Sequence, residues 1–222
     1  MSAVDGLETE VAGERMVLMP ERALYHPRSG ALLIADPHWG KAAAFRAAGL
    51  PVPGGTTAEG LARLTRALEK SGAARLVILG DLFHAREAKS PATLQAALAW
   101  RERHASLPVT LIRGNHDRHA GDPPGELGID CCDPPCAEPP FVLAHHPFDS
   151  PHGYVLAGHV HPSVTLRGVG RQRQRLPCFH FGARCGILPA FGEFTGTADV
   201  PVAPGDRVYV VADGQVIEIA AG

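Results

Sequence analysis

The segment Arg75-Leu76-Val77-Ile78-Leu79-Gly80-Asp81-Leu82-Phe83-His84 decides the fold. Its short run of β-branched and apolar residues predicts a buried strand, which ends abruptly at Gly80-Asp81. A strand with a glycine and a carboxylate at its carboxyl end presents that carboxylate at the mouth of an α/β sheet. Taken alone, Asp81 also fits an aspartate that merely opens a turn. The other strand ends decide between these two interpretations.

Four further strand-like segments end in side chains that commonly bind metal ions. They are residues 31–35 before Asp36-Pro37-His38, residues 109–112 before Gly114-Asn115-His116-Asp117, residues 141–144 before His145-His146, and residues 154–157 before Gly158-His159-Val160-His161. Five strand ends that carry Asp, Asn and His predict one metal site where the strands converge. Asp81 is therefore interpreted as a metal ligand at the end of its strand, and not as an aspartate that merely opens a turn.

The size and composition of the chain indicate one globular domain. The chain has 222 residues, 45% of them hydrophobic and 20% charged, which is ordinary for a soluble protein with a full core. We expect a single domain over residues 1–222, ordered from about residue 15 to about residue 220. The formal net charge of −2 gives no overall basic field, so any binding to nucleic acid must use a local patch.

The ends and the cysteines of the chain indicate its compartment. The N-terminus has no basic segment followed by an apolar one, so we expect no signal peptide, and no apolar run approaches the roughly 20 residues of a membrane span. Five cysteines without a regular spacing predict reduced thiols and a cytoplasmic location. For Cys131, Cys132 and Cys136 we expect free thiols in a proline-rich loop, with a structural zinc as the alternative.

Helices and strands alternate in the N-terminal half, whereas the C-terminal half contains mostly strands. In the first half we expect a loose start to about residue 14, a hairpin of residues 16–19 and 23–26, and a strand at 31–35. Helices are expected at 41–48, from an N-cap at Thr56 or Thr57 to Ser71, and after Ser90-Pro91. Residues 121–140 are expected to form an irregular excursion. Later strands are expected at 141–144, 154–157, 163–167, 176–181, 186–188, 206–212 and 215–219, with a hairpin turn at Asp213-Gly214. Two sheets packed face to face, with helices outside, satisfy both halves.

The strand ends provide seven candidate metal ligands: Asp36, His38, Asp81, Asn115, His145, His159 and His161. Oxygen and imidazole ligands without sulfur favour Mn²⁺, Fe or Zn²⁺ in a site other than a thiolate zinc. Seven ligands suit two ions about 3.5–4 Å apart that share a bridging carboxylate, an arrangement for in-line displacement at phosphorus. The chain has no Gly-x-Ser-x-Gly motif for a side-chain nucleophile, so we expect attack by a metal-activated water.

These motifs, in this order, resemble the calcineurin-like metallophosphoesterase superfamily over residues 31–161. The resemblance implies an α/β fold, a four-layer α/β/β/α sandwich of two packed mixed sheets. It also implies one ion at Asp36, His38, Asp81 and His161, and a second at Asp81, Asn115, His145 and His159, with Asp81 as the bridge. His116 matches the family position that protonates or stabilises the leaving oxygen, paired with Asp117. Both His145 and His146 could reach the metals, and we expect His145 to be the ligand because it directly follows its strand.

A narrower resemblance extends over nearly the whole chain. Residues 36–46, DPHWGKAAAFR, and residues 187–196, ILPAFGEFTG, are similar to the bacterial DNA ligase-associated phosphoesterases. The resemblance implies a Mn²⁺-dependent DNA endonuclease that acts on DNA, expected to be single-stranded, in a repair pathway with an ATP-dependent DNA ligase, a helicase and an exonuclease. One departure is that Pro37 and Trp39 flank His38 where we would expect leucines.

A DNA substrate requires cations that face phosphate groups. Five candidates lie within a few residues of a metal motif: Lys41, Arg46, Arg86, Arg113 and Arg118. A basic segment with Arg167, Arg171, Arg173 and Arg175 either follows a nucleic-acid backbone or is a polar turn. Trp39, Phe45, Phe191 and Phe194 either stack on bases or belong to the core, and His84, His119, His152 and His180 are candidates for a second shell.

Two other functions compete with the nuclease. The same two-ion chemistry serves a phosphodiesterase for nucleotides or cyclic nucleotides, or a phosphomonoesterase. A fold of this kind can also serve as a binding scaffold without catalysis, but such scaffolds typically lose metal ligands or the leaving-group histidine. Because this chain retains all of them, we favour an enzyme.

Overall fold

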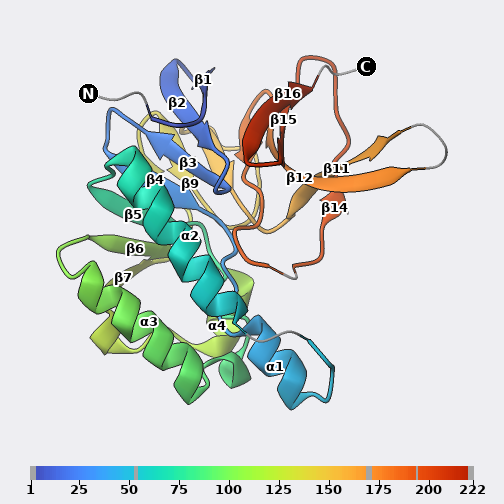
Figure 1. Cartoon of the computed structure of the whole chain (residues 1–222). Helices are drawn as coiled ribbons and strands as arrows, with labels where there is room; N and C mark the ends of the chain where they lie inside the picture. The colour runs from blue at the N-terminus through green and yellow to red at the C-terminus, as the bar shows by residue number, and fades with distance from the viewer. Residues whose placement is uncertain (1–3, 53–54, 169–171, 194, 220–222) are drawn as a thin grey trace.

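Two packed sheets form the body of the protein (Figure 1). The computed structural model describes residues 4–52, 55–168, 172–193 and 195–219. The first sheet has seven strands in sequence order: β1 (Leu7–Val11), β2 (Glu14–Met19), β3 (Ala23–His26), β4 (Ala31–Ile34), β5 (Arg75–Ile78), β6 (Val109–Ile112) and β7 (Ile129–Cys132). Neighbours are antiparallel up to β4 and parallel from β4 to β7. The parallel part is the one that ends in ligand motifs.

The second sheet is built almost entirely from the C-terminal half. Its main path runs β14 (Ala198–Asp199), β11 (Pro162–Arg167), β12 (Arg173–Phe181), β13 (Cys185–Ile187), β10 (Tyr154–Ala157), β9 (Phe141–Leu143) and β8 (Cys136–Glu138), and the hairpin of β15 (Arg207–Ala212) and β16 (Gln215–Ile219) pairs with β12. Strands β9, β10 and β13 are parallel to one another, and most other pairs are antiparallel. Both sheets are therefore mixed.

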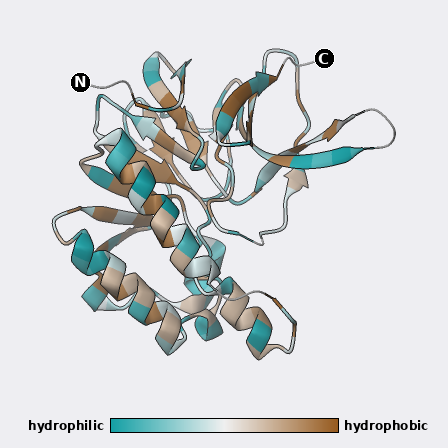
Figure 2. Ribbon diagram, viewed as in Figure 1, coloured by the Kyte–Doolittle hydropathy of each residue, from teal (hydrophilic) through white to brown (hydrophobic). Residues whose placement is uncertain are grey.

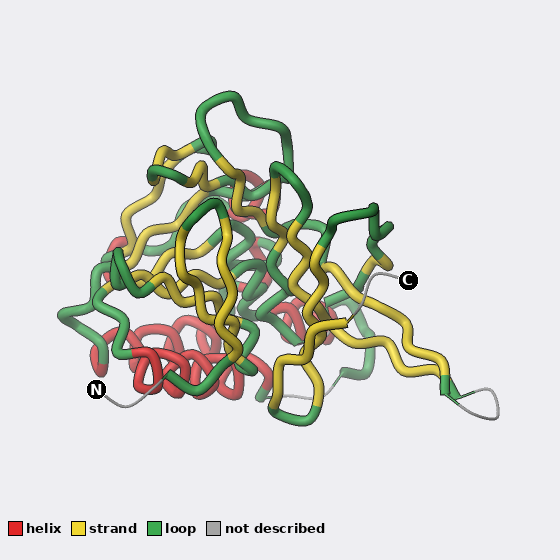
Figure 3. Tube along the Cα trace, turned by 90° about the horizontal axis from the view of Figure 1, so that it is seen from above, coloured by secondary structure: helices red, strands yellow, loops and turns green. Residues whose placement is uncertain are grey.

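The described helices all lie in the part of the chain that precedes β7. They are α1 (Lys41–Ala47), α2 (Thr56–Ser71), α3 (Pro91–Arg103) and α4 (Asn115–Ala120), with short 3₁₀ turns at Arg86–Ala88 and Gly125–Leu127. Helices α2 and α3 cover one face of the first sheet, and the second sheet lies beyond the other face (Figures 1 and 3). Two packed mixed sheets with flanking helices agree with the predicted fold class.

The alternation of side chains along the central strands explains this layering. Leu32 and Ile34 of β4 pack in the core that includes Leu64 of α2, whereas their neighbour Leu33 packs in the core between the sheets with Phe179 of β12. Successive side chains of a strand point to opposite faces, so a strand that is apolar throughout is buried on both. Figure 2 shows these strands as hydrophobic, whereas the outward faces of α2 and α3 are hydrophilic.

Most predicted elements are confirmed within a residue or two, but four details were wrong. The expected loose start contains β1, joined to β2 through left-handed Ala12 and Gly13, a tight turn without the usual Asn-Gly signal. The expected irregular excursion contains β7 and β8. The N-cap of α2 is Gly55, not a threonine, and β14 was not predicted.

The cysteine prediction was also partly wrong. Cys132 and Cys136 form a disulfide, whereas Cys131, Cys178 and Cys185 are free thiols. Because β7 and β8 run on either side of a short turn, the two sulfurs come within bonding distance, which a loop assignment could not foresee. Among the described helices, none has both the length and the apolar character needed to cross a membrane.

Candidate metal centre

The seven predicted ligands converge where the carboxyl ends of both sets of parallel strands meet. Asp36 and His38 follow β4, Asp81 follows β5, and Asn115 opens α4 after β6. His145 follows β9, and His159 and His161 follow β10. The turns after β4 and β5 are hydrogen-bonded to each other, because the amide of His38 donates to the carbonyl of Asp81 (3.0 Å).

Five of the seven candidate ligands adopt a backbone conformation that non-glycine residues rarely use. Their φ angles are 51° for Asp36, 45° for His38, 56° for Asp81, 68° for His159 and 51° for His161. Left-handed conformations of such residues cost energy and concentrate at functional sites, where the surrounding structure imposes them. Here they turn the chain sharply after each strand, so that the side chains point into one space.

Three motif glycines allow the ligands to approach one another. A Cβ atom at Gly80 would collide with the imidazole of His145, and one at Gly114 would collide with the carboxylate of Asp81. A Cβ atom at Gly158 would lie 2.5 Å from Oδ2 of Asp36. Gly80 and Gly158 are therefore required by packing against a ligand of the opposite sheet, and Gly114 by packing against a ligand of its own sheet, in addition to their role in the turns.

Asp36, His38 and His161 form the first of two clusters of donor atoms. Nε2 of His161 lies 3.4 Å from Oδ1 of Asp36 and 3.4 Å from Nε2 of His38, and Nε2 of His38 lies 3.9 Å from Oδ2 of Asp81. Carboxylate and imidazole atoms at these separations surround a space that suits one divalent ion.

The second cluster shares Asp81 with the first. Nε2 of His145 lies 3.4 Å from Oδ2 of Asp81, 2.9 Å from Oδ1 of Asn115 and 3.2 Å from Nδ1 of His159. The same oxygen of Asp81 thus faces a histidine of each cluster, as expected for a bridging carboxylate.

The charges and protonation states fit metal ions. Oδ1 of Asp36 is buried without a hydrogen-bond partner, an arrangement that is unfavourable unless a cation or donor occupies the space. Burial lowers the pKa of His38 to about 2, so its imidazole is neutral and can offer a lone pair. Burial alone would raise the pKa of Asp81, but the hydrogen bond and charge of His145 outweigh it and hold the pKa at about 2.

Backbone carbonyl groups orient the histidines. Nδ1 of His145 lies 2.9 Å from the carbonyl oxygen of Leu79, and Nδ1 of His161 lies 2.7 Å from that of Gly196. An Nδ1–H that donates to a carbonyl directs Nε2 at the metal and, in the neutral ring, leaves Nε2 free to bind it. Both imidazoles therefore present the correct nitrogen to the clusters.

The segment around Gly192 supports the centre from outside. The amide of Phe191 donates to the carbonyl of Ala35 (2.7 Å), and the amide of Gly192 donates to that of Asp36 (3.0 Å). Arg63 of α2 donates hydrogen bonds to the carbonyl of Phe191 and to the carboxylate of Glu193, and its guanidinium lies 4.6 Å from the ring centre of Phe191. Arg63 thus fastens this segment against the turn that carries the first ligand.

His116 and Asp117 are both at the site, but they are not paired as predicted. The carboxylate of Asp117 accepts hydrogen bonds from three backbone amides, those of Asp81 (2.7 Å), Leu82 (2.9 Å) and Gly114 (2.8 Å). Asp117 therefore shapes the turn that presents Asp81, so its role is positioning. Nδ1 of His116 contacts the carbonyl oxygen of His84 (2.5 Å), and its Nε2 lies 3.9 Å from Oδ2 of Asp81.

Two further histidines lie at the centre that the sequence did not rank as ligands. The ring of His84 stacks on that of His116, with centres 4.8 Å apart, and the ring of His146 packs on that of His159 at 3.9 Å. His84 therefore lies beside the centre, as predicted. His180 does not, because its Nε2 pairs with the carboxylate of Asp206 (2.8 Å). The adjacency of His84 to the Asp81 turn was the available signal.

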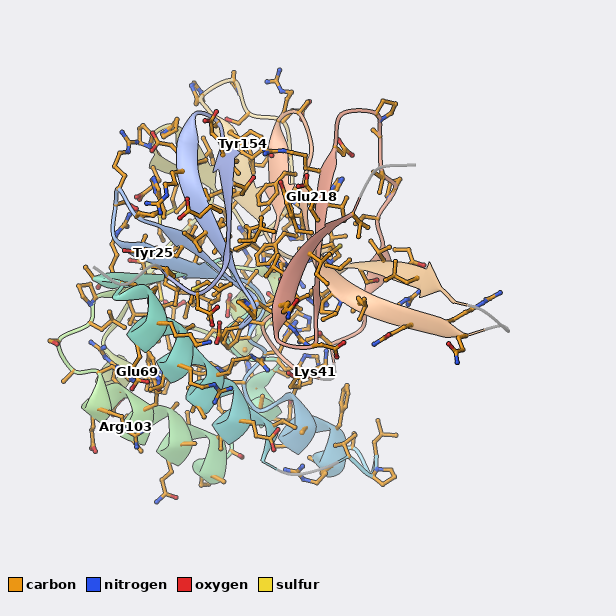
Figure 4. The ribbon with its side chains drawn as sticks, turned by 45° about the horizontal axis from the view of Figure 1, so that its top comes forward. Tyr25, Lys41, Glu69, Arg103, Tyr154 and Glu218 are labelled. Carbon is orange, nitrogen blue, oxygen red and sulfur yellow. A yellow bond between two sulfur atoms is a disulfide. The ribbon has the colours of Figure 1, made fainter. Side chains whose placement is uncertain are left out.

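The five candidate substrate cations have different environments. Lys41 is partly buried at the start of α1 (Figure 4). Burial lowers its pKa, and the charges of Asp36 and Asp81 oppose this change. Arg86 donates to the carbonyl of His119 (3.1 Å), Arg46 donates to that of Val52 (3.4 Å), and Arg118 is exposed on α4. Arg113 forms ion pairs with Asp122 (2.7 Å) and Asp133 (3.2 Å), so two acidic side chains already neutralise the charge that a phosphate group would need.

The aromatic candidates belong mostly to the core. Trp39 and Phe191 are 2% and 1% exposed, so neither can stack on a base, whereas Phe45 is partly exposed on α1. Phe194 and Arg171 lie outside the described residues, as does the side chain of Arg167.

Comparison with known proteins identifies the family. The model of the family "Calcineurin-like phosphoesterase" matches residues 31–182. The crystal structure of the Pseudomonas putida nuclease MPE is similar to the whole chain, with 45% sequence identity, a TM-score of 0.86, and coverage of 96% of this chain and 99% of that one. The phosphoesterase YfcE of E. coli is more distant, at 15% identity and a TM-score of 0.42 over 86% of this chain and 98% of that one. A search among curated proteins finds no match. The chain belongs to the calcineurin-like phosphoesterase family.

Proposed function

We propose that this metal-dependent phosphoesterase is a Mn²⁺-dependent phosphodiesterase that cuts DNA internally. The observation that carries the proposal is the pair of donor clusters that share Oδ2 of Asp81, with His116 beside them. The 45% identity to a nuclease over 96% of the chain supports a nucleic acid as the substrate. Manganese suits a site of carboxylate, amide and imidazole ligands, and single-stranded DNA is the expected form.

The residues of the centre divide the work of phosphodiester hydrolysis. Ions bound at the two clusters would supply Lewis-acid charge and lower the pKa of a water for attack on phosphorus. Asp81, held by the amide of His116 (2.9 Å) and by the turn around Asp117, fixes the spacing of the clusters. His116 is placed to donate a proton to the leaving oxygen, because only its Nε2 remains available at the centre once Nδ1 contacts the carbonyl of His84.

Lys41 is the strongest candidate for direct contact with the substrate. It lies at the first turn after the His38 motif, and the charges of Asp36 and Asp81 oppose the fall in its pKa that burial causes. A lysine that remains positive beside the clusters can bind a non-bridging phosphate oxygen. Membership in a cytoplasmic repair pathway with an ATP-dependent DNA ligase, a helicase and an exonuclease is proposed on the family resemblance alone.

The test compares three substrates under one set of conditions. The protein is stripped of metal, reloaded with Mn²⁺, Zn²⁺ or Fe²⁺, and assayed on bis-p-nitrophenyl phosphate, p-nitrophenyl phosphate and circular single-stranded DNA. We expect Mn²⁺-dependent cleavage of the diester and nicking of the circle, which has no ends. Hydrolysis of the monoester or of small diesters, with the circle intact, would overturn the nuclease proposal and favour a small-molecule phosphoesterase. A protein inactive with every metal would favour a binding scaffold.

A further inference from the structure

We propose that the hairpin of β11 and β12 is a basic arm that binds the phosphate backbone of a single-stranded polynucleotide leaving the metal centre. The proposal rests on the proposed nuclease function and names a surface for the substrate outside the centre. Strand β11 begins at Pro162, directly after the candidate ligand His161. The arm is therefore connected to the metal centre by a single peptide bond.

The arm projects away from the rest of the molecule. Figures 1 and 3 show β11 and the first part of β12 as a two-stranded ribbon that extends beyond both sheets. At about 3.3 Å per residue, the six residues of β11 reach about 20 Å from His161. That distance corresponds to about six stacked nucleotides at about 3.4 Å each.

The outer part of the arm is basic. Arg173 is exposed and, among the described residues, has no hydrogen-bond or ion-pair partner. Arg167 is its register partner on β11, so two arginines occupy directly opposed positions. The register therefore places two arginines at the same level of the arm, a composition that suits binding to the phosphate groups of a polynucleotide.

Arg175 provides an internal contrast with Arg173. The two are separated by one residue of an extended strand, so they lie on the same face of the arm. Unlike Arg173, Arg175 forms an ion pair with Asp199 of β14 (2.9 Å) and donates to the carbonyl of Thr197 (3.3 Å). Asp199 thus masks the inner arginine, and the outer one is available to a phosphate.

Two variants test the arm without touching the centre. Arg173→Gln should weaken binding of a fluorescein-labelled oligothymidylate about fivefold at 0.1 M salt, and should reduce the slope of log K against log salt by about 0.7, the value of one phosphate contact. Asp199→Asn should release Arg175 and strengthen binding by a similar factor. Binding is measured by stopped-flow anisotropy with the Mn²⁺-loaded protein, before the strand is cut.

The controls separate this proposal from the proposed function. Both variants should hydrolyse bis-p-nitrophenyl phosphate at the wild-type rate with Mn²⁺, because this diester is too small to reach the arm. A wild-type protein that does not cut DNA overturns the function itself. A wild-type protein that cuts DNA, with unchanged affinity and salt slope in Arg173→Gln and Arg167→Gln/Arg173→Gln, overturns the arm. A variant that changes the mass measured by light scattering would instead make the hairpin a contact between two copies, which also overturns it.

Discussion

The two sheets contribute to the metal centre in different ways. The first sheet supplies the oxygen ligands and one imidazole, that of His38. Backbone amides fix the carboxylates: Oδ1 of Asp81 accepts from the amide of His116 (2.9 Å), and Oδ2 of Asp36 accepts from the amide of His159 (2.9 Å). The second sheet supplies three imidazoles, two of which are oriented by carbonyl groups. The helices cover the first sheet, whereas the second carries the projecting hairpin (Figure 1). We infer that the first sheet fixes the metal positions and the second adapts the centre to its substrate.

Asp81→Asn is expected to give the largest effect, because it removes the charge that both clusters share. Loss of several kcal/mol of transition-state stabilisation corresponds to a fall of about 10³-fold or more in diester turnover. The measurement is steady-state hydrolysis of bis-p-nitrophenyl phosphate with saturating Mn²⁺. Asp130→Asn, an exposed change on β7 of the same sheet, is the matched control. Near-normal turnover of Asp81→Asn would show that the first sheet does not fix the metals.

His116→Ala should reduce turnover by about 10²–10⁴-fold, the usual contribution of a general acid. Metal content, measured by plasma emission spectrometry, should remain that of the wild type, since Nε2 of His116 is 3.9 Å from Asp81 and the cluster ligands are unchanged. The control is His152→Ala, a change at an exposed histidine in the loop between β9 and β10. Loss of metal together with activity would make His116 a ligand and remove its proposed role in proton transfer.

Asp117→Asn tests whether the turn that presents Asp81 contributes to metal binding in addition to the ligands themselves. A neutral amide accepts less strongly from the three amide groups that hold the turn of Asp81, so the turn should loosen. We expect a 10–100-fold higher Mn²⁺ concentration for half-maximal activity, with turnover restored at saturation. Asp133→Asn, 73% exposed, is the control. A lower turnover that excess Mn²⁺ cannot restore would instead support the predicted partnership with His116.

The convergence of the candidate metal ligands could be predicted from sequence because each lies at the end of a strand, and parallel strands bring their carboxyl ends together. All seven candidates lie in the two clusters. The role of Asp117 could not be predicted, since its partners Asp81 and Leu82 are some 35 residues away and the contacts are made to backbone atoms. The motif showed only that an aspartate was present. Its hydrogen bonds depend on how the two turns meet.

Strands β7 and β8 escaped prediction for a different reason. Prolines and glycines flank both short strands, and neither strand shows alternating apolar residues, because each lies at an edge of its sheet. Such edge strands are specified by pairing with a neighbour: β7 pairs with β6 and β8 with β9. Local composition carries little of that information.

Arg63→Met should have a smaller effect that reaches the centre through the segment around Gly192. The variant keeps apolar contact with Phe191 but loses the hydrogen bonds to its carbonyl and to Glu193. We expect the Mn²⁺ concentration for half-maximal activity to rise about three- to tenfold, a small effect for the loss of a group that supports a metal ligand. Arg63→Lys should recover part of this loss. Arg66→Met on the exposed side of α2 is the control. If only thermal stability falls, the segment supports the fold and not the ligands.

The disulfide should have the smallest effect on activity, although it lies on the short connection that leads from the first sheet to the second. Cys132 ends β7 of the first sheet and Cys136 begins β8 of the second. Closing a loop of about five residues removes little entropy from the unfolded chain, so Cys132→Ser/Cys136→Ser should lower the free energy of unfolding by about 2 kcal/mol at most. Urea denaturation with and without reductant measures this, with Cys131→Ser as the control. A large fall in Mn²⁺-dependent turnover would show that the covalent link, in addition to packing, sets how the sheets meet at the metal centre.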